Sequence, residues 1–213
     1  MRTIDDRAGR HDERVWVWFR LLLRFALGAT MVGYGAFKVI PVQMPEPSLL
    51  RLLTPFGDLS PMGVLWAAMG AARPYQMFAG AVEMLGGALL FLPRTTLLGA
   101  IIGLGSAIQV LALNLSYDVP VKLFSFHMVL VSLLLIAPDA PRLIRVLFGQ
   151  PTGPSTKPPL APGPRGWRVA LTAQLASGVF IIGMNLYSAQ QAFYSDATIG
   201  FGLWALDSWP VHA

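Results

Sequence analysis

The sequence predicts an all-α membrane protein, in which a four-helix transmembrane bundle is followed by a fifth C-terminal transmembrane helix. Three observations lead to this fold class. Hydrophobic residues make up 54% of the 213 residues and charged residues 13%, whereas an ordinary soluble domain has about 25% charged residues. The mean hydropathy is +0.57, and the apolar residues fall into five long segments. There is too little charge to cover a water-facing surface of this size, which excludes a soluble globular protein and a disordered chain.

The charge balance is basic, with 16 lysine and arginine residues against 11 acidic ones and a net charge of +5. In a chain this apolar, the excess does not indicate nucleic acid, which is bound through an extended basic face. Anionic membrane lipid is the partner that fits it. The sequence also contains no cysteine, which excludes disulfides, thiolate-held iron–sulfur clusters and a cysteine nucleophile. With only three histidines in the whole sequence, we expect no metal site.

Residues 1–14 are polar and form the expected cytoplasmic N-terminal segment. The first predicted span, Val15–Ile40, follows as 26 almost wholly apolar residues, which as a helix are about 39 Å long and can cross a bilayer with some tilt. It is too long for the apolar core of a signal peptide. We therefore expect an uncleaved transmembrane helix, which begins a bundle over residues 15–148.

Residues 41–73 are expected to lie in the membrane interface. Three prolines interrupt the first seven residues of this segment, which prevents a helix there. Ser60 and Pro61 then have the residue types of an N-cap and a first helical position. The helix that they open runs to about Ala72 and is about 18 Å long, too short to cross. Pro74 disfavours helical backbone at the residue before it, so we expect a break there.

Three further spans complete the predicted bundle: Tyr75–Leu92, Leu97–Leu115 and Val121–Ala137. Short polar or proline-containing breaks separate them. After the last span, Pro141–Phe148 alternates arginine with large apolar residues, which is typical of an amphipathic interface helix.

The C-terminal part of the chain is predicted to contain one more span. Residues 149–166 are rich in proline and glycine, which is typical of a linker, here on the cytoplasmic side. Residues 167–190 form the predicted fifth transmembrane helix. The tail, residues 191–213, is expected on the outer side, and its stretch Thr198–Trp209 is expected to be extended rather than helical.

The distribution of basic residues predicts which way the chain crosses the membrane. Ten lysine and arginine residues lie on the side of the N-terminus and four on the other. Arg20 and Arg24 are left out of this count because both are expected to snorkel toward the basic side. Tryptophan and tyrosine residues gather at both ends of the predicted spans, as in aromatic belts. We therefore expect the N-terminus in the cytoplasm and the C-terminus outside.

Glu83 lies near the middle of the predicted span Tyr75–Leu92, where an ionisable group costs roughly 2.5 kcal/mol or more and usually faces the bundle interior. Residues on the same face of the helix, among them Gly80 and Gly87, are small enough to let another helix approach closely. Two interpretations follow: a protonated or paired glutamate that fixes helix packing, or a site for a proton or a cofactor. Glu83 is the best catalytic candidate.

A rim of polar residues is expected near the outer ends of the spans. Asn114, Tyr117 and Asp118 follow i, i+3, i+4 spacing and share a face if that helix continues. Lys122 and Ser125 share a face of the following span. With the lysine that closes the first span and the histidine in the fourth, they surround the outer end of an apolar bundle. The ligand-binding candidates are therefore Lys38, Glu83, Asn114, Tyr117, Asp118, Lys122, Ser125 and His127.

Other interpretations of this rim stay open. His127 follows Lys122 by five residues, about 140° around a helix, so both meet one ligand only if His127 points toward a different neighbouring span. A lone histidine in a span is also explained by a packing hydrogen bond. Lys38 and Lys122 are each explained as interfacial anchors whose ammonium groups snorkel to the membrane surface.

Three motifs resemble the DoxX-like family of bacterial integral membrane proteins. The first is Arg24–Gly28 followed by the glycines and lysine of Gly33–Lys38, and the second is Glu83–Gly87, a glutamate before a glycine pair. The third, Asn114–His127, is similar to one branch of the family. The similarity covers about residues 20–139 and implies a four-helix bundle in the bacterial cytoplasmic (inner) membrane.

The resemblance also implies a function, since some members of the family are quinone-linked membrane subunits of oxidoreductases. It implies a quinone as cofactor and Glu83 as the partner of its proton or headgroup, with Asn114, Lys122 and His127 as polar contacts. In the matching branch an outer-side domain follows the fifth span and opens with a stretch similar to Leu203–Trp209. The tail is therefore expected to be the truncated start of such a domain.

The sequence has no redox centre of its own, so electrons would need a bound quinone or a partner protein. The alternative function is a non-catalytic membrane anchor or a small-solute transport module. The partners compatible with the sequence are membrane lipids, a redox protein and further copies of the chain in a homo-oligomer.

Overall fold

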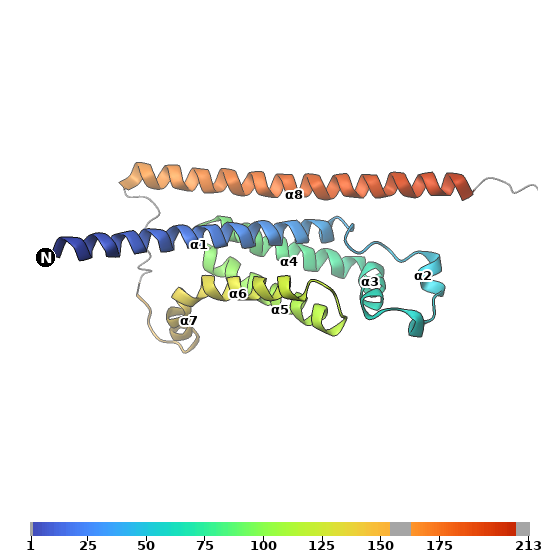
Figure 1. The fold of residues 1–213 in the computed structure, drawn as a ribbon, viewed down its shortest axis with the longest axis horizontal. Coiled ribbons are helices and arrows are strands. Elements are labelled where there is room, and N and C mark those ends of the chain that lie inside the picture. The colour runs from blue at the N-terminus through green and yellow to red at the C-terminus, as the bar shows by residue number, and fades with distance from the viewer. Residues whose placement is uncertain (1, 154–162, 208–213) are drawn as a thin grey trace, which may run out of the picture.

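The computed structural model describes residues 2–153 and 163–207, and all regular structure in these residues is helical. The helices follow in the order α1 (Arg2–Val39), α2 (Leu49–Leu53), η1 (Phe56–Asp58), α3 (Pro61–Ala71), α4 (Arg73–Phe91), α5 (Thr96–Ser116), α6 (Lys122–Ile136), η2 (Ala137–Asp139), α7 (Ala140–Leu147) and α8 (Gly163–Asp207). The long helices run along a common direction, with α8 on one side of α1 and α4 and with α5 and α6 on the other (Figure 1).

Within the described residues, four helical segments are long and apolar enough to cross a membrane. They are Val15–Val39, Thr96–Ser116, Lys122–Leu147 and Gly163–Ser195. They correspond to four of the five predicted spans, although the third segment also includes α7, which the sequence predicts as an interface helix after the span. The remaining predicted span, Tyr75–Leu92, corresponds to α4. This helix has 19 residues and a length of about 28 Å, but it is less apolar than the other four segments because it contains Gln76 and Glu83. Both of these side chains are buried against neighbouring helices rather than presented to the surroundings.

The junction between α3 and α4 is tighter than the sequence predicts. As expected, α3 begins with a proline, and Ser60 caps it by accepting a hydrogen bond of 3.1 Å from the Gly63 amide. The prediction that Pro74 excludes helix from the preceding residue is wrong, because α4 begins at Arg73. Ala72 is the single non-helical residue between α3 and α4, with φ −98° and ψ 54°. Pro74 lies in the first turn of α4, where its missing N–H needs no intrahelical partner.

Helices α1 and α4 are antiparallel and in backbone contact, which glycines on both helices allow. Gly28 of α1 faces Gly87 of α4, and Gly35 faces Gly80. A Cβ atom on Gly87 would lie 2.7 Å from the Gly28 carbonyl oxygen, and one on Gly80 would lie 2.6 Å from that of Gly35. On α5, a Cβ atom on Gly99 would lie 2.9 Å from a carbonyl oxygen of α4. Small residues therefore bring three helices together.

Helices α1, α4, α5 and α6 enclose one apolar cluster and are called the helical core below. The buried residues of the cluster are Leu27, Met31, Leu90, Ala100, Leu135 and Ile136. The core has two ends. The Lys38 end holds the C-termini of α1 and α5 and the N-termini of α4 and α6. The Arg24 end holds the C-termini of α4 and α6 together with the middle of α1 and the first turns of α5.

Two arginines of α1 hold other helices at the Arg24 end. Arg24 Nε donates to the Leu90 carbonyl oxygen over 2.9 Å, and Arg20 Nη2 donates to that of Leu135 over 3.1 Å. These carbonyl groups lie in the last turns of α4 and α6, where a cation is favourable. Arg24 also donates to Gln174 Oε1 of α8 over 3.1 Å. The expectation that Arg24 snorkels is wrong, since it is 9% exposed, and Arg20 likewise bonds a helix end.

Helix α8 is longer than the predicted span at 167–190, since it covers Gly163–Asp207. The prediction of an extended backbone over Thr198–Trp209 is wrong as far as Asp207, because the described residues of this stretch are helical. No proline interrupts the sequence between the first turn of α8 and its end, so the backbone hydrogen bonds can continue. Residues 154–162 of the predicted linker and 208–213 of the tail lie outside the described residues.

Gly80→Ala is expected to destabilise the protein, because the new Cβ atom would lie 2.6 Å from the Gly35 carbonyl oxygen and 2.7 Å from Lys38 Cβ. Overpacking of this kind costs about 1–3 kcal/mol. Gly105→Ala is the matched control, since a Cβ atom there meets no atom within 4 Å and alanine favours a helix by up to about 1 kcal/mol. Thermal unfolding of both purified variants measures the difference. Equal stability of the two variants would contradict the backbone contact between α1 and α4.

Candidate functional site

A cavity of about 70 Å³ opens at the Lys38 end of the helical core. Its walls come from the four core helices and from residues 41–73, which supply Met44, Leu65, Trp66 and Met69. The polar side chains that line it are Tyr34, Lys38, Gln43, Glu83, Gln109, Asn114 and Ser125. A cavity of this size has room for several water molecules or one small polar group. Half of the predicted ligand-binding residues, Lys38, Glu83, Asn114 and Ser125, thus meet at one cavity.

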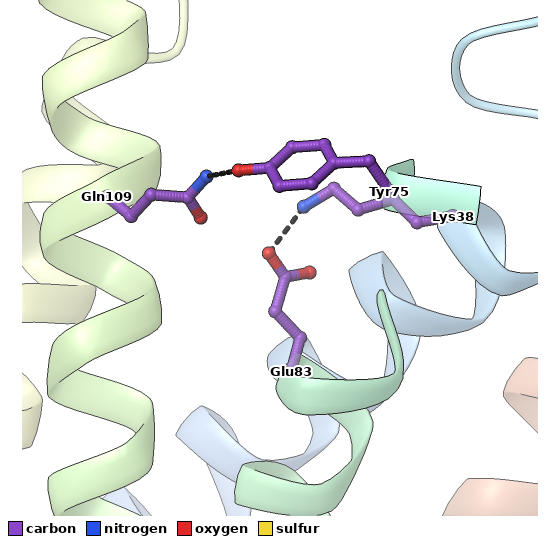
Figure 2. A network of polar contacts seen from close by, with 4 residues as sticks. All are labelled: Lys38, Tyr75, Glu83 and Gln109. Atoms are coloured by element: carbon purple, nitrogen blue, oxygen red, sulfur yellow. Dashed lines mark hydrogen bonds and ion pairs between the residues drawn. The ribbon is translucent and has the colours of Figure 1, made fainter. Parts of the chain in front are cut away.

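The cavity contains a buried ion pair. Lys38 Nζ of α1 donates to Glu83 Oε1 of α4 over 2.5 Å, and the two residues are 6% and 4% exposed (Figure 2). The interpretation of Lys38 as an anchor that snorkels is therefore wrong, because its ammonium group turns inward to the carboxylate. Each charge compensates the other in a place where both side chains are largely removed from bulk solvent. Loss of one partner of such a pair typically costs about 3–5 kcal/mol.

A second polar contact joins α4 and α5 beside the pair. Gln109 Nε2 donates to the Tyr75 hydroxyl group over 3.1 Å. Figure 2 shows this contact in one view with the ion pair, with Tyr75 and Glu83 coming from α4, Lys38 from α1 and Gln109 from α5. Because Lys38, Glu83 and Gln109 all line the cavity, three helices direct polar groups into it.

Some buried polar atoms in this region have no hydrogen-bond partner in the part of the chain that the structure describes. They are Glu83 Oε2, Gln43 Oε1 and both polar atoms of the Gln76 side chain. Gln76 is fully buried and lies two turns before Glu83 on the same face of α4. Buried polar atoms are nearly always hydrogen-bonded in proteins. This face of α4 therefore retains hydrogen-bonding capacity that the described residues do not use.

Asn114 and Ser125 join α5 to α6 in another wall of the cavity. Asn114 Nδ2 donates to Ser125 Oγ over 3.1 Å, and the two residues are 6% and 1% exposed. Ser125 Oγ also bonds the carbonyl oxygen of Lys122 over 2.9 Å. The hydroxyl group is thus fully engaged, while the Asn114 side-chain carbonyl remains an acceptor that can face a bound molecule.

The other four predicted residues do not line the cavity. Lys122 and Asp118 form an exposed ion pair, and the hydrogen bond and charge of Lys122 hold the pKa of the Asp118 carboxyl below its ordinary value. Tyr117 packs against an apolar cluster beside the cavity. His127 is exposed, and its Nδ1 lies 2.6 Å from the carbonyl oxygen of Leu123, one turn earlier on the same helix.

The expected meeting of Lys122 and His127 with Asn114 and Ser125 at one ligand is therefore wrong. The reason is the rotation of α6 about its axis. Ser125 faces the interior, and His127, two residues later, lies about 200° around the helix. Lys122 lies in the first turn of α6, where its ammonium group forms an ion pair with Asp118 of the preceding loop.

Among the lining residues with a hydrogen-bonding side chain, sequence reasoning missed four, namely Tyr34, Gln43, Trp66 and Gln109. Gln109 carries a usable signal, since it is an amide inside a predicted span, five residues before Asn114. Gln43 and Trp66 belong to the segment 41–73, where no periodicity indicates the direction of a side chain. They reach the cavity because this segment folds across the ends of the core helices.

The cavity can hold a small polar group by hydrogen bonds within mostly apolar walls. It offers one ammonium group, one carboxylate, three amides and two hydroxyl groups. Ligand sites of small molecules commonly combine such walls with a few directed polar groups. Within the described residues, no three histidine, aspartate or glutamate side chains lie close enough to hold a metal ion.

The described residues thus form an all-helical protein with four helices long and apolar enough to cross a membrane and a polar cavity at one end. No family model and no solved structure matches the chain. The chain is similar to an uncharacterized protein of Bacillus subtilis (strain 168), YwoB, with 26% identity over 142 residues that cover 62% of this chain and 82% of YwoB. Since that name states no activity, the function is argued from the cavity.

Lys38→Met and Glu83→Leu are each expected to destabilise the protein by about 3–5 kcal/mol, because each leaves a buried charge without its partner. The double variant is expected to be more stable than either single variant, since both charges are removed together. Denaturant unfolding of the four proteins gives the coupling energy of the pair.

The exposed pair Lys122 and Asp118 provides the control cycle, with Lys122→Gln and Asp118→Asn. Solvent screens this pair, so its coupling is expected to be much smaller. Asparagine tolerates the positive φ of 52° at position 118. Coupling energies of similar size in the two cycles would contradict the special role of the buried pair.

Proposed function

We propose that this chain is a quinone-linked membrane subunit of an oxidoreductase and a member of the DoxX-like family. In this proposal the helical core is a four-helix transmembrane bundle and α8 is a fifth span, in a bacterial cytoplasmic membrane. The observation that carries the proposal is the buried Lys38–Glu83 pair in the wall of a mostly apolar cavity. Ionisable groups within membrane segments are costly, and they generally mark a functional site.

The residues of the cavity fit a quinone headgroup by their chemistry. The ring of such a group has apolar faces, which Met44 and Met69 can contact, and carbonyl oxygens at its edge, which need hydrogen-bond donors. Lys38 Nζ and Gln109 Nε2 are donors in the cavity wall. A bound quinone would supply the two-electron redox chemistry that these side chains lack, and a redox protein partner would exchange the electrons.

Glu83 and Lys38 would handle the protons of this chemistry. A proton that moves along the 2.5 Å contact from Lys38 Nζ to Glu83 Oε1 converts the charged pair into a neutral one. Such a transfer leaves the net charge of the cavity unchanged, so it adds no desolvation cost for an isolated charge. The neutral amine of Lys38 can then accept a proton from a quinol headgroup, while Glu83 holds the transferred proton. In the reverse direction, the Lys38 ammonium group donates a proton to the reduced headgroup.

A small-solute transport module is the second candidate, and the volume of the cavity favours it. A cavity of about 150 Å³ is known to hold benzene, so a cavity of about 70 Å³ is small for a ring with substituents. In the quinone proposal, residues 41–73 must move away from the core to admit the headgroup. In the solute proposal, the cavity accepts its ligand at its present size.

Organic extraction of the purified protein tests the two candidates. The quinone proposal expects about one quinone per chain, from membranes that contain it, and a large loss in Glu83→Gln, which keeps the shape but loses the charge that holds Lys38. Asp118→Asn is the matched control, because it removes an exposed carboxylate at the same end of the core, and it should retain the quinone. Phospholipid alone in the wild-type extract, or equal quinone in both variants, would contradict the proposal.

The proposed topology places the N-terminus in the cytoplasm and the C-terminus outside. Reporter proteins fused after Gly163 and after Ala213, one before and one after α8, should therefore report opposite sides of the membrane. The expected result for Gly163 is cytoplasmic, because most lysine and arginine residues lie on that side. A cytoplasmic signal from both fusions would show that α8 does not cross.

A further inference from the structure

Helix α7 is short and amphipathic, and it lies at the Arg24 end of the core. The 3₁₀ turn η2 separates it from α6, and a proline lies at the start of each element. As a result α7 does not continue the line of α6 (Figure 1). Its arginines, Arg142 and Arg145, are three residues apart and share one side of the helix. The opposite side carries Leu143, Ile144 and Leu147.

Most of the apolar side of α7 is exposed within the described chain. Leu143 packs against the core cluster, and this contact fixes the rotation of the helix. Leu147 and Phe148 are 74% and 76% exposed, and Ile144 is 54% exposed. No residue of α7 is buried. The chain therefore presents a row of large apolar side chains next to two exposed arginines.

Other residues at the same end have the character of a membrane–water interface. Arg94, in the turn between α4 and α5, has its Cζ atom 6.0 Å from the centre of the Trp167 ring at the start of α8. Trp167 is partly exposed, and Arg165 and Arg168 on either side of it are exposed. Tryptophan and arginine at the ends of apolar helices are typical of the headgroup level of a bilayer. Basic residues thus surround this end, and α7 contains no acidic residue.

We propose that α7 binds the surface of an anionic phospholipid leaflet. Ile144, Leu147 and Phe148 insert between the acyl chains, and Arg142 and Arg145 contact the phosphate groups. The charge of α7 favours lipid over a protein partner, because an exposed apolar face next to arginines matches an apolar layer beneath a layer of negative charge. The proposal concerns a surface at the other end of the core from the cavity, so it is independent of the proposed function.

The absence of cysteine from the sequence allows a single labelled position. Leu147→Cys carries an environment-sensitive fluorophore, and the full chain is reconstituted in vesicles of phosphatidylcholine alone or with about a third of phosphatidylglycerol. In the anionic vesicles, we expect blue-shifted emission and quenching by lipids brominated near the headgroup. The double variant Arg142→Gln with Arg145→Gln should lower the ratio of membrane-bound to membrane-free α7 about 30-fold. The reason is that each arginine near an anionic surface raises this ratio about fivefold.

Lys122→Gln with Arg73→Gln is the matched control, because it removes two charges at the Lys38 end. This variant should behave like the wild type. Emission that is independent of lipid charge and unchanged in the α7 variant would overturn the proposal. Stronger quenching from the bilayer centre than from the headgroup level would also overturn it, because α7 would then continue the α6 span. Emission that depends on the ratio of protein to lipid rather than on the lipid charge would also overturn the proposal, because it would show that α7 contacts a second copy of the chain.

Discussion

The backbone contact between α1 and α4 is the constraint on which the rest of the structure depends. Gly28 and Gly35 are seven residues apart on α1, and Gly80 and Gly87 are seven apart on α4. Because the helices are antiparallel, one register places both pairs face to face, with carbonyl oxygens where a Cβ atom would be. Seven residues are close to two helical turns, so each helix presents both its glycines on one side. The register is therefore fixed at two points rather than one.

This register also positions the polar groups at both ends of the contact. Lys38 lies three residues beyond Gly35, and Glu83 lies three residues beyond Gly80. A Cβ atom on Gly80 would lie 2.7 Å from Lys38 Cβ, so Lys38 begins opposite Gly80. Glu83 is three residues further along α4, about 4.5 Å along the axis, and the long side chain of Lys38 covers this distance to reach the carboxylate. At the other end, Arg24 reaches along α1 to the Leu90 carbonyl in the same way.

The long apolar segments could be predicted from the sequence because hydropathy and length depend on each residue separately. The cap at Ser60 and the amphipathic α7 are local patterns, and they too were predictable. The direction of each side chain was not, because it depends on how a helix is rotated in its packing. Lys38 is therefore buried and His127 exposed, although the sequence gives no reason to expect this difference between the two polar residues. The helical tail was missed because aromatic and glycine-rich sequences do not by themselves end a helix.

The cavity is built from one rigid part and one separately packed part. The ion pair belongs to α1 and α4, whose contact leaves no space for a single extra carbon atom. The other part is residues 41–73, which form one wall of the cavity and are called the cover here. The two ends of the cover are in close contact with each other, since a Cβ atom on Gly70 would lie 2.2 Å from the Pro45 carbonyl oxygen. Near α4, Ala72 alone breaks the helical backbone between the cover and the core. Movement of this segment as a unit would therefore enlarge the cavity while Lys38 and Glu83 keep their positions.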